Sequence, residues 1–147
     1  MKKYDYTTSI QVDATPQKAF DCINKVTKWW TENLEGHSQQ LDDEFKVRFG
    51  DVHYSKQRLI EVVPDKKVVW QVTESQLNFI KDKSEWTNTK LVFEVDTDNG
   101  KTQVHFTHIG LIPNVECYDA CSNAWAEYIQ GSLLRLINTG KGNPAGR

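Results

Sequence analysis

The stretch NVECYDACSNAWAEYIQGSLLRLINT, residues 114–139, decides the fold that this sequence predicts. Its apolar side chains recur at spacings of three and four, which is typical of one face of an amphipathic α-helix. Gly140 follows as a C-cap, and Lys141 places a favourable cation near the negative end of the helix. We therefore expect a long helix at residues 114–139, with an apolar face made of Tyr118, Cys121, Trp125, Tyr128, Ile129, Ser132, Leu133, Leu136 and Ile137.

The segments before this helix alternate apolar and polar residues, as half-buried strands do. Gly50-Asp51 and Asn99-Gly100 stand between such segments and predict tight hairpin turns. Because each strand follows its predecessor through a short turn, we expect a continuous antiparallel meander. Strands are predicted at residues 8–12, 44–49, 52–63, 68–73, 89–95 and 102–108, and a loop is predicted at residues 34–43.

Two short helices are predicted between the first strand and this loop. Thr15 followed by Pro16 is an N-cap and first-turn signal, and a helix over residues 16–25 follows. A second helical turn carries Trp29 and Trp30, of which one is expected under the sheet edge and the other at a cavity entrance or partner surface. The predicted class is α+β, with a curved antiparallel sheet of about six to seven strands covered by the terminal helix.

Length, charge and cysteine content restrict the class of protein. A chain of 147 residues is predicted to form a single domain over residues 1–147, with a flexible tail at 140–147. The formal net charge of -2 argues against a nucleic-acid partner, and no segment is apolar enough for membrane insertion. Three cysteines, an odd number, favour a reduced protein, which we expect to be cytoplasmic.

Several short motifs along the chain are shared with one superfamily. They are Thr15-Pro16, Lys28-Trp29-Trp30, Phe49-Gly50-Asp51, Val69-Trp70 and FTHIGL at residues 106–111. On these residues the chain resembles the SRPBCC superfamily, the START-related helix-grip fold, and in particular its branch related to the activator of Hsp90 ATPase. The resemblance covers nearly the whole chain and implies a hydrophobic cavity between the sheet and the terminal helix. Asn88 departs from it, because a glycine is expected there; asparagine also tolerates a positive φ.

The candidate ligand-binding residues lie on the predicted inner face of the sheet and on the helix that covers it. Strand alternation and helical spacing place apolar side chains on these two facing surfaces. His108 is in phase with Phe106, and it would supply one orienting hydrogen bond and a charge that responds to pH near neutrality. The blander interpretation for each residue is ordinary core packing, and both can hold, since a cavity wall is core that is left incomplete. The predicted ligand-binding residues are Trp70, Phe93, Phe106, His108, Tyr118, Cys121 and Trp125.

Other kinds of site are less well supported by the sequence. Cys117 and Cys121 share a helix face, and His108 could join them around a metal ion. Cysteine side chains are, however, commonly buried in protein cores. We therefore expect no metal and no other cofactor. Glu74 and Glu85 flank the loop that follows the Trp70 strand. They stand either at a cavity entrance or, by the blander interpretation, in solvent.

The leading hypothesis is that the protein binds a small hydrophobic or amphipathic molecule between sheet and terminal helix, and is not an enzyme. One alternative is an enzyme of the cyclase, dehydratase or hydrolase type that uses His108 as acid or base. The other, suggested by the family resemblance, is an interaction module for an Hsp90-family chaperone ATPase. A homodimer is left open.

Overall fold

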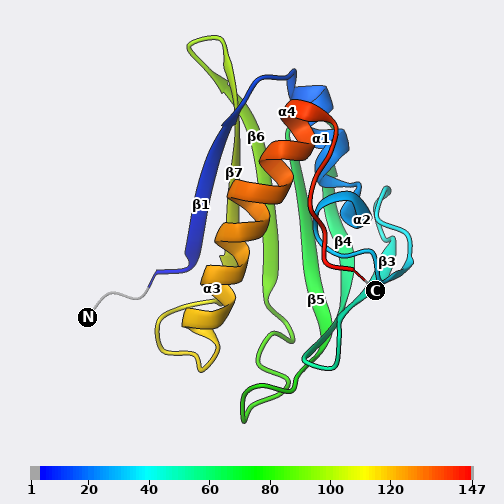
Figure 1. Cartoon of the computed structure of the whole chain (residues 1–147), viewed down its shortest axis with the longest axis vertical. Coiled ribbons are helices and arrows are strands. Elements are labelled where there is room, and N and C mark those ends of the chain that lie inside the picture. Colours follow the sequence, from blue (N-terminus) through cyan, green and yellow to red (C-terminus); the bar gives the residue numbers. More distant parts are fainter. Residues whose placement is uncertain (1–3, 147) are drawn as a thin grey trace.

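One curved antiparallel sheet carries a long C-terminal helix across one of its faces, as the sequence predicted (Figure 1). The computed structural model describes residues 4–146 of the chain. The sheet has seven strands in the order β1-β7-β6-β5-β4-β3-β2, so that the first strand pairs with the last. The strands are β1 (Tyr6–Val12), β2 (Leu34–Gly36), β3 (Glu44–Phe49), β4 (His53–Val63), β5 (Lys67–Leu77), β6 (Lys90–Asp98) and β7 (Lys101–Ile109).

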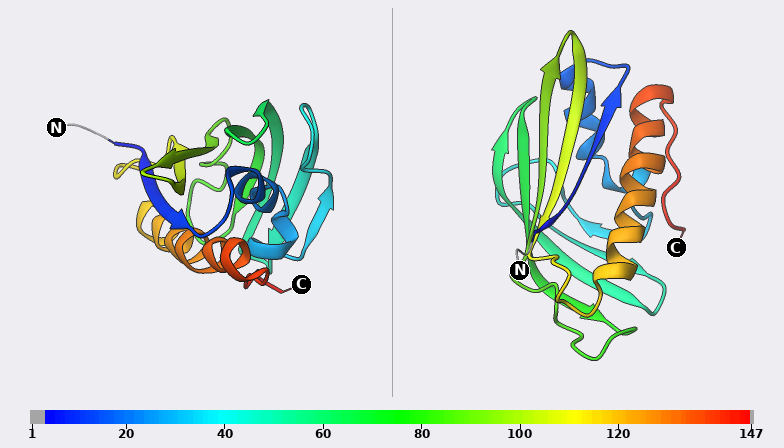
Figure 2. Two further views of the ribbon diagram at one scale, coloured as in Figure 1. Left: turned by 90° about the horizontal axis from the view of Figure 1, so that it is seen from above. Right: turned by 90° about the vertical axis from the view of Figure 1, so that its left-hand side faces the viewer.

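The terminal helix is a single rod in three segments, and all the helices lie on the same side of the sheet (Figure 2). It begins at Tyr118 rather than at residue 114, because the preceding residues form turns. Gly140 ends it with a φ of 84°, which confirms the predicted cap. The helices are α1 (Pro16–Ile23), α2 (Val26–Trp29), α3 (Tyr118–Ala126), the π-helical segment η1 (Glu127–Leu133) and α4 (Leu134–Thr139).

Part of the segment predicted as a loop is instead a short edge strand. β2 pairs antiparallel with β3, and Gly36 lies opposite Phe45. A strand of three residues is too short to show a periodic pattern, which is why the alternation of side chains did not reveal it. Gly36 has a φ of 110°, and a Cβ atom there would collide with the carbonyl oxygen of Glu44. The close approach of these two strands therefore requires glycine.

Residues 140–146, which we call the C-terminal strap, run back along the terminal helix toward α2 (Figure 1). The Ala145 N–H donates to the Trp30 carbonyl at 2.9 Å. Farther back, the Asn143 N–H donates to the Ser132 hydroxyl at 2.8 Å. The strap thus differs from the flexible tail that the sequence suggested, because its backbone groups find partners on other segments. Arg147 lies outside the described residues.

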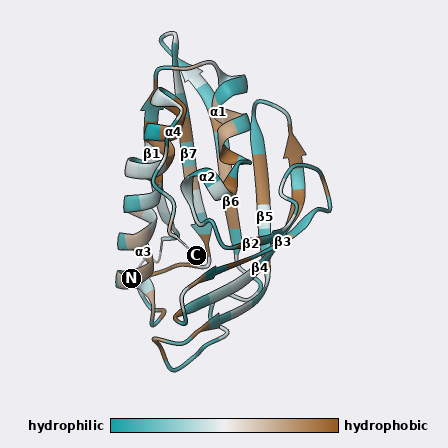
Figure 3. Cartoon of the chain, turned by 45° about the vertical axis from the view of Figure 1, so that its right-hand side comes forward, coloured by the Kyte–Doolittle hydropathy of each residue, from teal (hydrophilic) through white to brown (hydrophobic). Residues whose placement is uncertain are grey.

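The interior is apolar and the outer face of the sheet is polar. Hydrophobic stretches run along the strands, whereas the outward side of the terminal helix is largely hydrophilic (Figure 3). The largest fully buried side chains include Trp29, Trp70, Trp125, Phe45, Phe93 and Phe106. No helix within residues 4–146 is long and apolar enough to cross a membrane.

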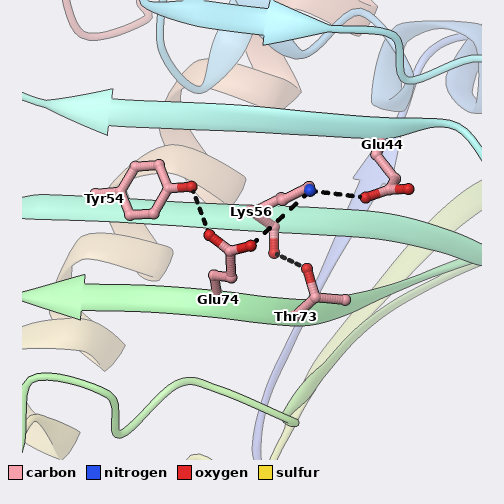
Figure 4. A network of polar contacts seen from close by, with 5 residues as sticks. All are labelled: Glu44, Tyr54, Lys56, Thr73 and Glu74. Atoms are coloured by element: carbon pink, nitrogen blue, oxygen red, sulfur yellow. Dashed lines mark hydrogen bonds and ion pairs between the residues drawn. The ribbon is translucent and has the colours of Figure 1, made fainter.

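A cross-strand polar network occupies the outer face over β3, β4 and β5 (Figure 4). Lys56 lies between the carboxylates of Glu44, at 3.0 Å, and Glu74, at 3.9 Å. The hydrogen bond with Glu44 raises the pKa of Lys56 above its usual value. The Tyr54 O–H donates to Glu74 at 3.0 Å. Glu74 therefore belongs to the outer face of the sheet and does not stand at a cavity entrance.

Candidate functional site

Five tryptophans meet between the sheet and the terminal helix, and we call them the tryptophan array: Trp29, Trp30, Trp70, Trp86 and Trp125. The Trp30 and Trp125 rings lie 5.1 Å apart between centroids at an interplanar angle of 23°. Trp125 and Trp86 follow at 5.8 Å and 11°. Trp30 also stacks on Trp29 at 6.2 Å and on Trp70 at 6.1 Å. The space that the sequence left open as a cavity is thus largely filled by side chains.

An open cleft of about 180 Å³ remains at one end of the array, between α3, the β3–β4 turn and the loop at residues 78–89. Ala120 and Ala124 leave room on the helix side because their side chains are short, and both are exposed. Val52 and Phe79 also line the cleft and are 52% and 45% exposed, so they form its apolar mouth. The larger wall residues are Trp30, Phe49, His53, Trp86, Trp125 and Tyr128.

Two of the seven predicted ligand-binding residues, Cys121 and Trp125, line this cleft. The others pack in the interior or against its edge rather than in the cleft wall. Trp125 forms the boundary, because its ring lies 4.5 Å from that of Phe106 on the buried side. The residues outside the wall are Trp70, Phe93, Phe106 and His108, which are fully buried, and Tyr118, which is half-buried.

Several wall residues were missed by reasoning from the sequence. Phe79 and Trp86 lie in a segment without periodicity, where two large apolar residues in polar surroundings were the available signal. His53 could not be placed until the hairpin register was known, and it pairs with Phe49. Of the adjacent tryptophans near the N-terminus, it is Trp30 that lines the cleft.

His108 is held by hydrogen bonds at both ring nitrogens. The Trp125 indole N–H donates to Nδ1 at 3.0 Å, and Nε2 lies 2.9 Å from the Thr89 hydroxyl. Because an indole N–H can only donate, Nδ1 is the unprotonated nitrogen and Nε2 carries the proton. The Thr89 O–H donates onward to the Trp86 carbonyl at 2.6 Å. Burial, with a smaller contribution from His53, lowers the pKa of His108 to about 3, so it does not titrate near neutrality as the sequence suggested.

A second histidine, His53, lines the cleft. Its Nε2 lies 2.8 Å from the Ser55 hydroxyl, whereas Nδ1 makes no hydrogen bond within the described part of the chain. The imidazole meets Phe49 at 4.9 Å and Trp86 at 4.7 Å between centroids, both nearly edge to face. Burial lowers its pKa to about 3, so the ring is neutral at physiological pH.

Two carboxylates fasten the loop at residues 78–89 to the start of the terminal helix. Glu85 accepts the backbone N–H groups of Glu116 and Cys117, each at 2.9 Å, at the positive end of the helix. In return Glu116 accepts the Lys81 N–H at 3.0 Å, and this bond lowers the pKa of the Glu116 carboxyl. Asn88 has a φ of 73°, so the predicted positive φ is confirmed. Glu85 therefore fastens the turn just before α3 and helps to position Trp86.

The two helical cysteines lie close together beside the cleft. Interaction with the Cys121 thiol, and then burial, raises the pKa of Cys117 above its usual value. Trp86 keeps its indole N–H without a hydrogen-bond partner among the described residues. Within residues 4–146, no group of three or more His, Cys, Asp or Glu side chains is arranged to hold a metal ion. The alternative of a metal site built on these cysteines and His108 therefore has no support in the geometry.

Comparison with known proteins gives the same architecture. The chain matches the family model described as "Activator of Hsp90 ATPase homolog 1-like protein" over residues 13–137. The solved Aha1 dimer from Colwellia psychrerythraea superposes with a TM-score of 0.75 at 24% identity, covering 97% of this chain and 100% of that one.

More distant structures share the fold alone. Protein MLL2253 from Mesorhizobium loti has a TM-score of 0.71 at 11% identity, over 92% of this chain and 96% of that one. Protein SSP2350 from Staphylococcus saprophyticus has a TM-score of 0.67 at 14% identity, over 97% and 98%. No curated protein matches the chain in sequence. Because the family model spans most of the chain, the protein belongs to the activator of Hsp90 ATPase homolog 1-like family.

Proposed function

We propose that the protein binds a small apolar molecule in the cleft beside the tryptophan array. The observation that carries this proposal is an open hollow of about 180 Å³ whose walls are aromatic rings and short aliphatic side chains. Apolar hollows with a few polar groups are the usual form of small-molecule sites. A well-formed apolar cavity of roughly 150 Å³ is large enough to bind benzene. The cleft is therefore matched to a ligand, or the end of a ligand, of about one ring.

The surroundings of His108 do not meet the requirements of the enzyme alternative. A general acid or base must reach the reacting group and exchange a proton with it. Both nitrogens of His108 already have partners, Trp125 and Thr89. The ring is fully buried and stands outside the cleft wall. These contacts favour binding over acid–base chemistry at His108.

The proposal is tested by filling the cleft from its exposed side. Ala124→Leu adds a bulky side chain at an exposed helical position, where the fold should tolerate it. Asn123→Leu is the matched control, since Asn123 is exposed on the same helix but does not line the cleft.

Titration with toluene and with hexan-1-ol, followed by NMR of the tryptophan indole N–H resonances, provides the measurement. We expect at least one compound to shift the Trp30 and Trp86 signals in the unmodified protein and in Asn123→Leu. Ala124→Leu should reduce the affinity by about tenfold or more, because the added side chain occupies the ligand volume. If neither compound shifts these signals, or if Ala124→Leu binds as well as its control, the proposal fails.

A further inference from the structure

The walls of the cleft have a shape that distinguishes flat ligands from chain-like ones. Trp86 and Trp125 lie within 11° of parallel, and Trp125 and Trp30 within 23°, so the three indoles form one stack in the wall of the cleft. An aromatic ligand can pack against the rim of such a stack in offset-stacked or edge-to-face geometry, with a contribution beyond its buried area. The volume of about 180 Å³ lies below the usual range of roughly 300–1,000 Å³ for sites that enclose drug-sized ligands. Shape and size together favour one planar ring over a long acyl chain.

The polar character of the cleft is set by His53 and the residues behind it. The Gln57 amide N–H₂ donates to the Ser55 hydroxyl, and both side chains are fully buried. The hydroxyl has one proton of its own, and His53 Nε2, at 2.8 Å, is the remaining partner to receive it. Nε2 is then unprotonated, and the neutral ring carries its proton on Nδ1. The uncommitted nitrogen of His53 is therefore a hydrogen-bond donor.

Charge limits the ligand further. The residues that line the cleft include no lysine, arginine or carboxylate. A ligand carboxylate would lose its hydration in this apolar hollow without gaining an ion pair, which is costly. An uncharged oxygen acceptor, in contrast, can receive the His53 N–H without that penalty.

We propose that the cleft takes an uncharged planar aromatic ring that carries an oxygen acceptor, such as an aryl ketone or aryl ether. The ring packs against the rim of the indole stack beside Trp86 and Trp125, and the oxygen accepts a hydrogen bond from His53 Nδ1–H. This inference rests on the proposed function, because it names the chemistry of the molecule that would occupy the same cleft.

Three compounds of similar size test the planar ring and the oxygen acceptor separately: acetophenone, ethylbenzene and cyclohexyl methyl ketone. Ethylbenzene keeps the ring and lacks the acceptor, whereas cyclohexyl methyl ketone keeps the acceptor and lacks the planar ring. We expect acetophenone to bind most tightly by NMR titration. One neutral hydrogen bond corresponds to a preference of roughly fivefold over ethylbenzene. The flat ring should give a preference of roughly threefold or more over the cyclohexyl ketone.

His53→Phe should remove the preference for acetophenone over ethylbenzene while ethylbenzene still binds. The tautomer provides a second measurement that needs no substitution, because the ¹⁵N shifts of the imidazole show directly which nitrogen is protonated. We expect protonation at Nδ1 in His53 and at Nε2 in His108.

The outcomes distinguish this inference from the proposed function. If ethylbenzene or the cyclohexyl ketone binds as tightly as acetophenone, or if His53 is protonated at Nε2, the ligand class is wrong although the cleft still binds. If toluene and hexan-1-ol bind but none of the three test compounds does, the inference is likewise overturned. If toluene and hexan-1-ol leave the Trp30 and Trp86 signals unshifted, the proposed function itself fails.

Discussion

Trp125 on the terminal helix donates its indole N–H to Nδ1 of His108 on β7 at 3.0 Å. This bond joins the helix to the sheet inside the core, where each partner would otherwise leave a buried polar atom unpaired. Thr89 extends the chain from His108 to the Trp86 carbonyl. The same set of bonds therefore fixes the helix, the sheet and one wall of the cleft. A paired network of this kind adds rigidity because every member is satisfied.

Replacement of Trp125 by phenylalanine tests the contribution of this bond. Trp125→Phe leaves Nδ1 of His108 without a hydrogen-bond donor. We therefore expect it to lower the free energy of unfolding by about 1–3 kcal/mol more than the same replacement at a tryptophan whose indole N–H makes no hydrogen bond. Trp70→Phe is the matched control, since Trp70 is also fully buried but its indole N–H has no partner within residues 4–146. Urea unfolding of both variants gives the difference. Equal losses would show that only ring volume matters.

Two histidines, the fully buried His108 and the half-buried His53, predict how stability depends on pH. Burial lowers the pKa of both His53 and His108 to about 3, whereas an unfolded histidine has a pKa near 6.5. Between these pH values the unfolded chain therefore binds more protons than the folded chain. The contribution of the two histidines to the free energy of unfolding is fully present above about pH 6.5 and is lost as the pH falls toward about 3. The expected slope is about 1.4 kcal/mol per pH unit for each histidine in this window.

Urea unfolding between pH 7 and pH 4.5 or so measures this slope, above the range in which most carboxylates titrate. His53→Phe removes one of the two groups and should reduce the slope by about half. A free energy of unfolding that stays constant across this range would contradict the neutral state of the two rings.

Removal of the Glu85 carboxylate should loosen the loop that carries Trp86. Glu85→Gln keeps the length of the side chain and removes the charge that accepts two N–H groups at the start of the helix. We expect a loss of about 1 kcal/mol in unfolding free energy. Amide hydrogen exchange should also become faster at residues 78–89. Glu127→Gln, at an exposed position in η1, provides the comparison and should change neither quantity measurably.

Alanine replacements at two glycines of the C-terminal strap test whether the strap stabilises the fold. A Cβ atom at Gly142 would collide with the Lys28 carbonyl oxygen and lie 3.1 Å from that of Ser132. We expect Gly142→Ala to lower the unfolding free energy by about 1–3 kcal/mol, because the strap must move away from the helix. Gly146→Ala is the control, since the nearest atom to its new Cβ would be Glu32 Oε1 at 4.0 Å. Thermal unfolding of the two variants measures this difference. If the strap does not stabilise the fold, the two variants will be equally stable.

The fold could be predicted from the sequence because it depends on local patterns. Thr15 caps α1 through the Lys18 N–H at 3.1 Å, as the Thr-Pro pair indicates. The strand meander and the terminal helix follow from periodicities of two and of three to four. β2 was missed because three residues carry no periodicity. The strap was missed because it is held through its own backbone groups, at Asn143 and Ala145, which no side-chain pattern reveals.

The cleft could be predicted only in part, because it depends on how side chains from distant segments share a volume. Alternation correctly placed Phe93 and Phe106 on the inner face, but it could not show that neighbouring rings fill the space. The position of Trp86 depends on two carboxylates and a turn at Asn88, none of which forms a recognisable pattern. Cys121 and Trp125 were found because helical spacing alone directs them toward the sheet.

The stacked indoles also make the protein an unusual chromophore. Transitions of rings whose centroids lie 5.1 to 6.2 Å apart couple electronically, so Trp29, Trp30, Trp86 and Trp125 should absorb as an array rather than as independent groups. Such coupling gives a paired positive and negative band in circular dichroism, and the pair weakens steeply as the rings separate. The signal follows the distance between the terminal helix and the loop at residues 78–89, independently of helix content. An opening of the cleft would therefore be visible optically while every helix and strand stays intact.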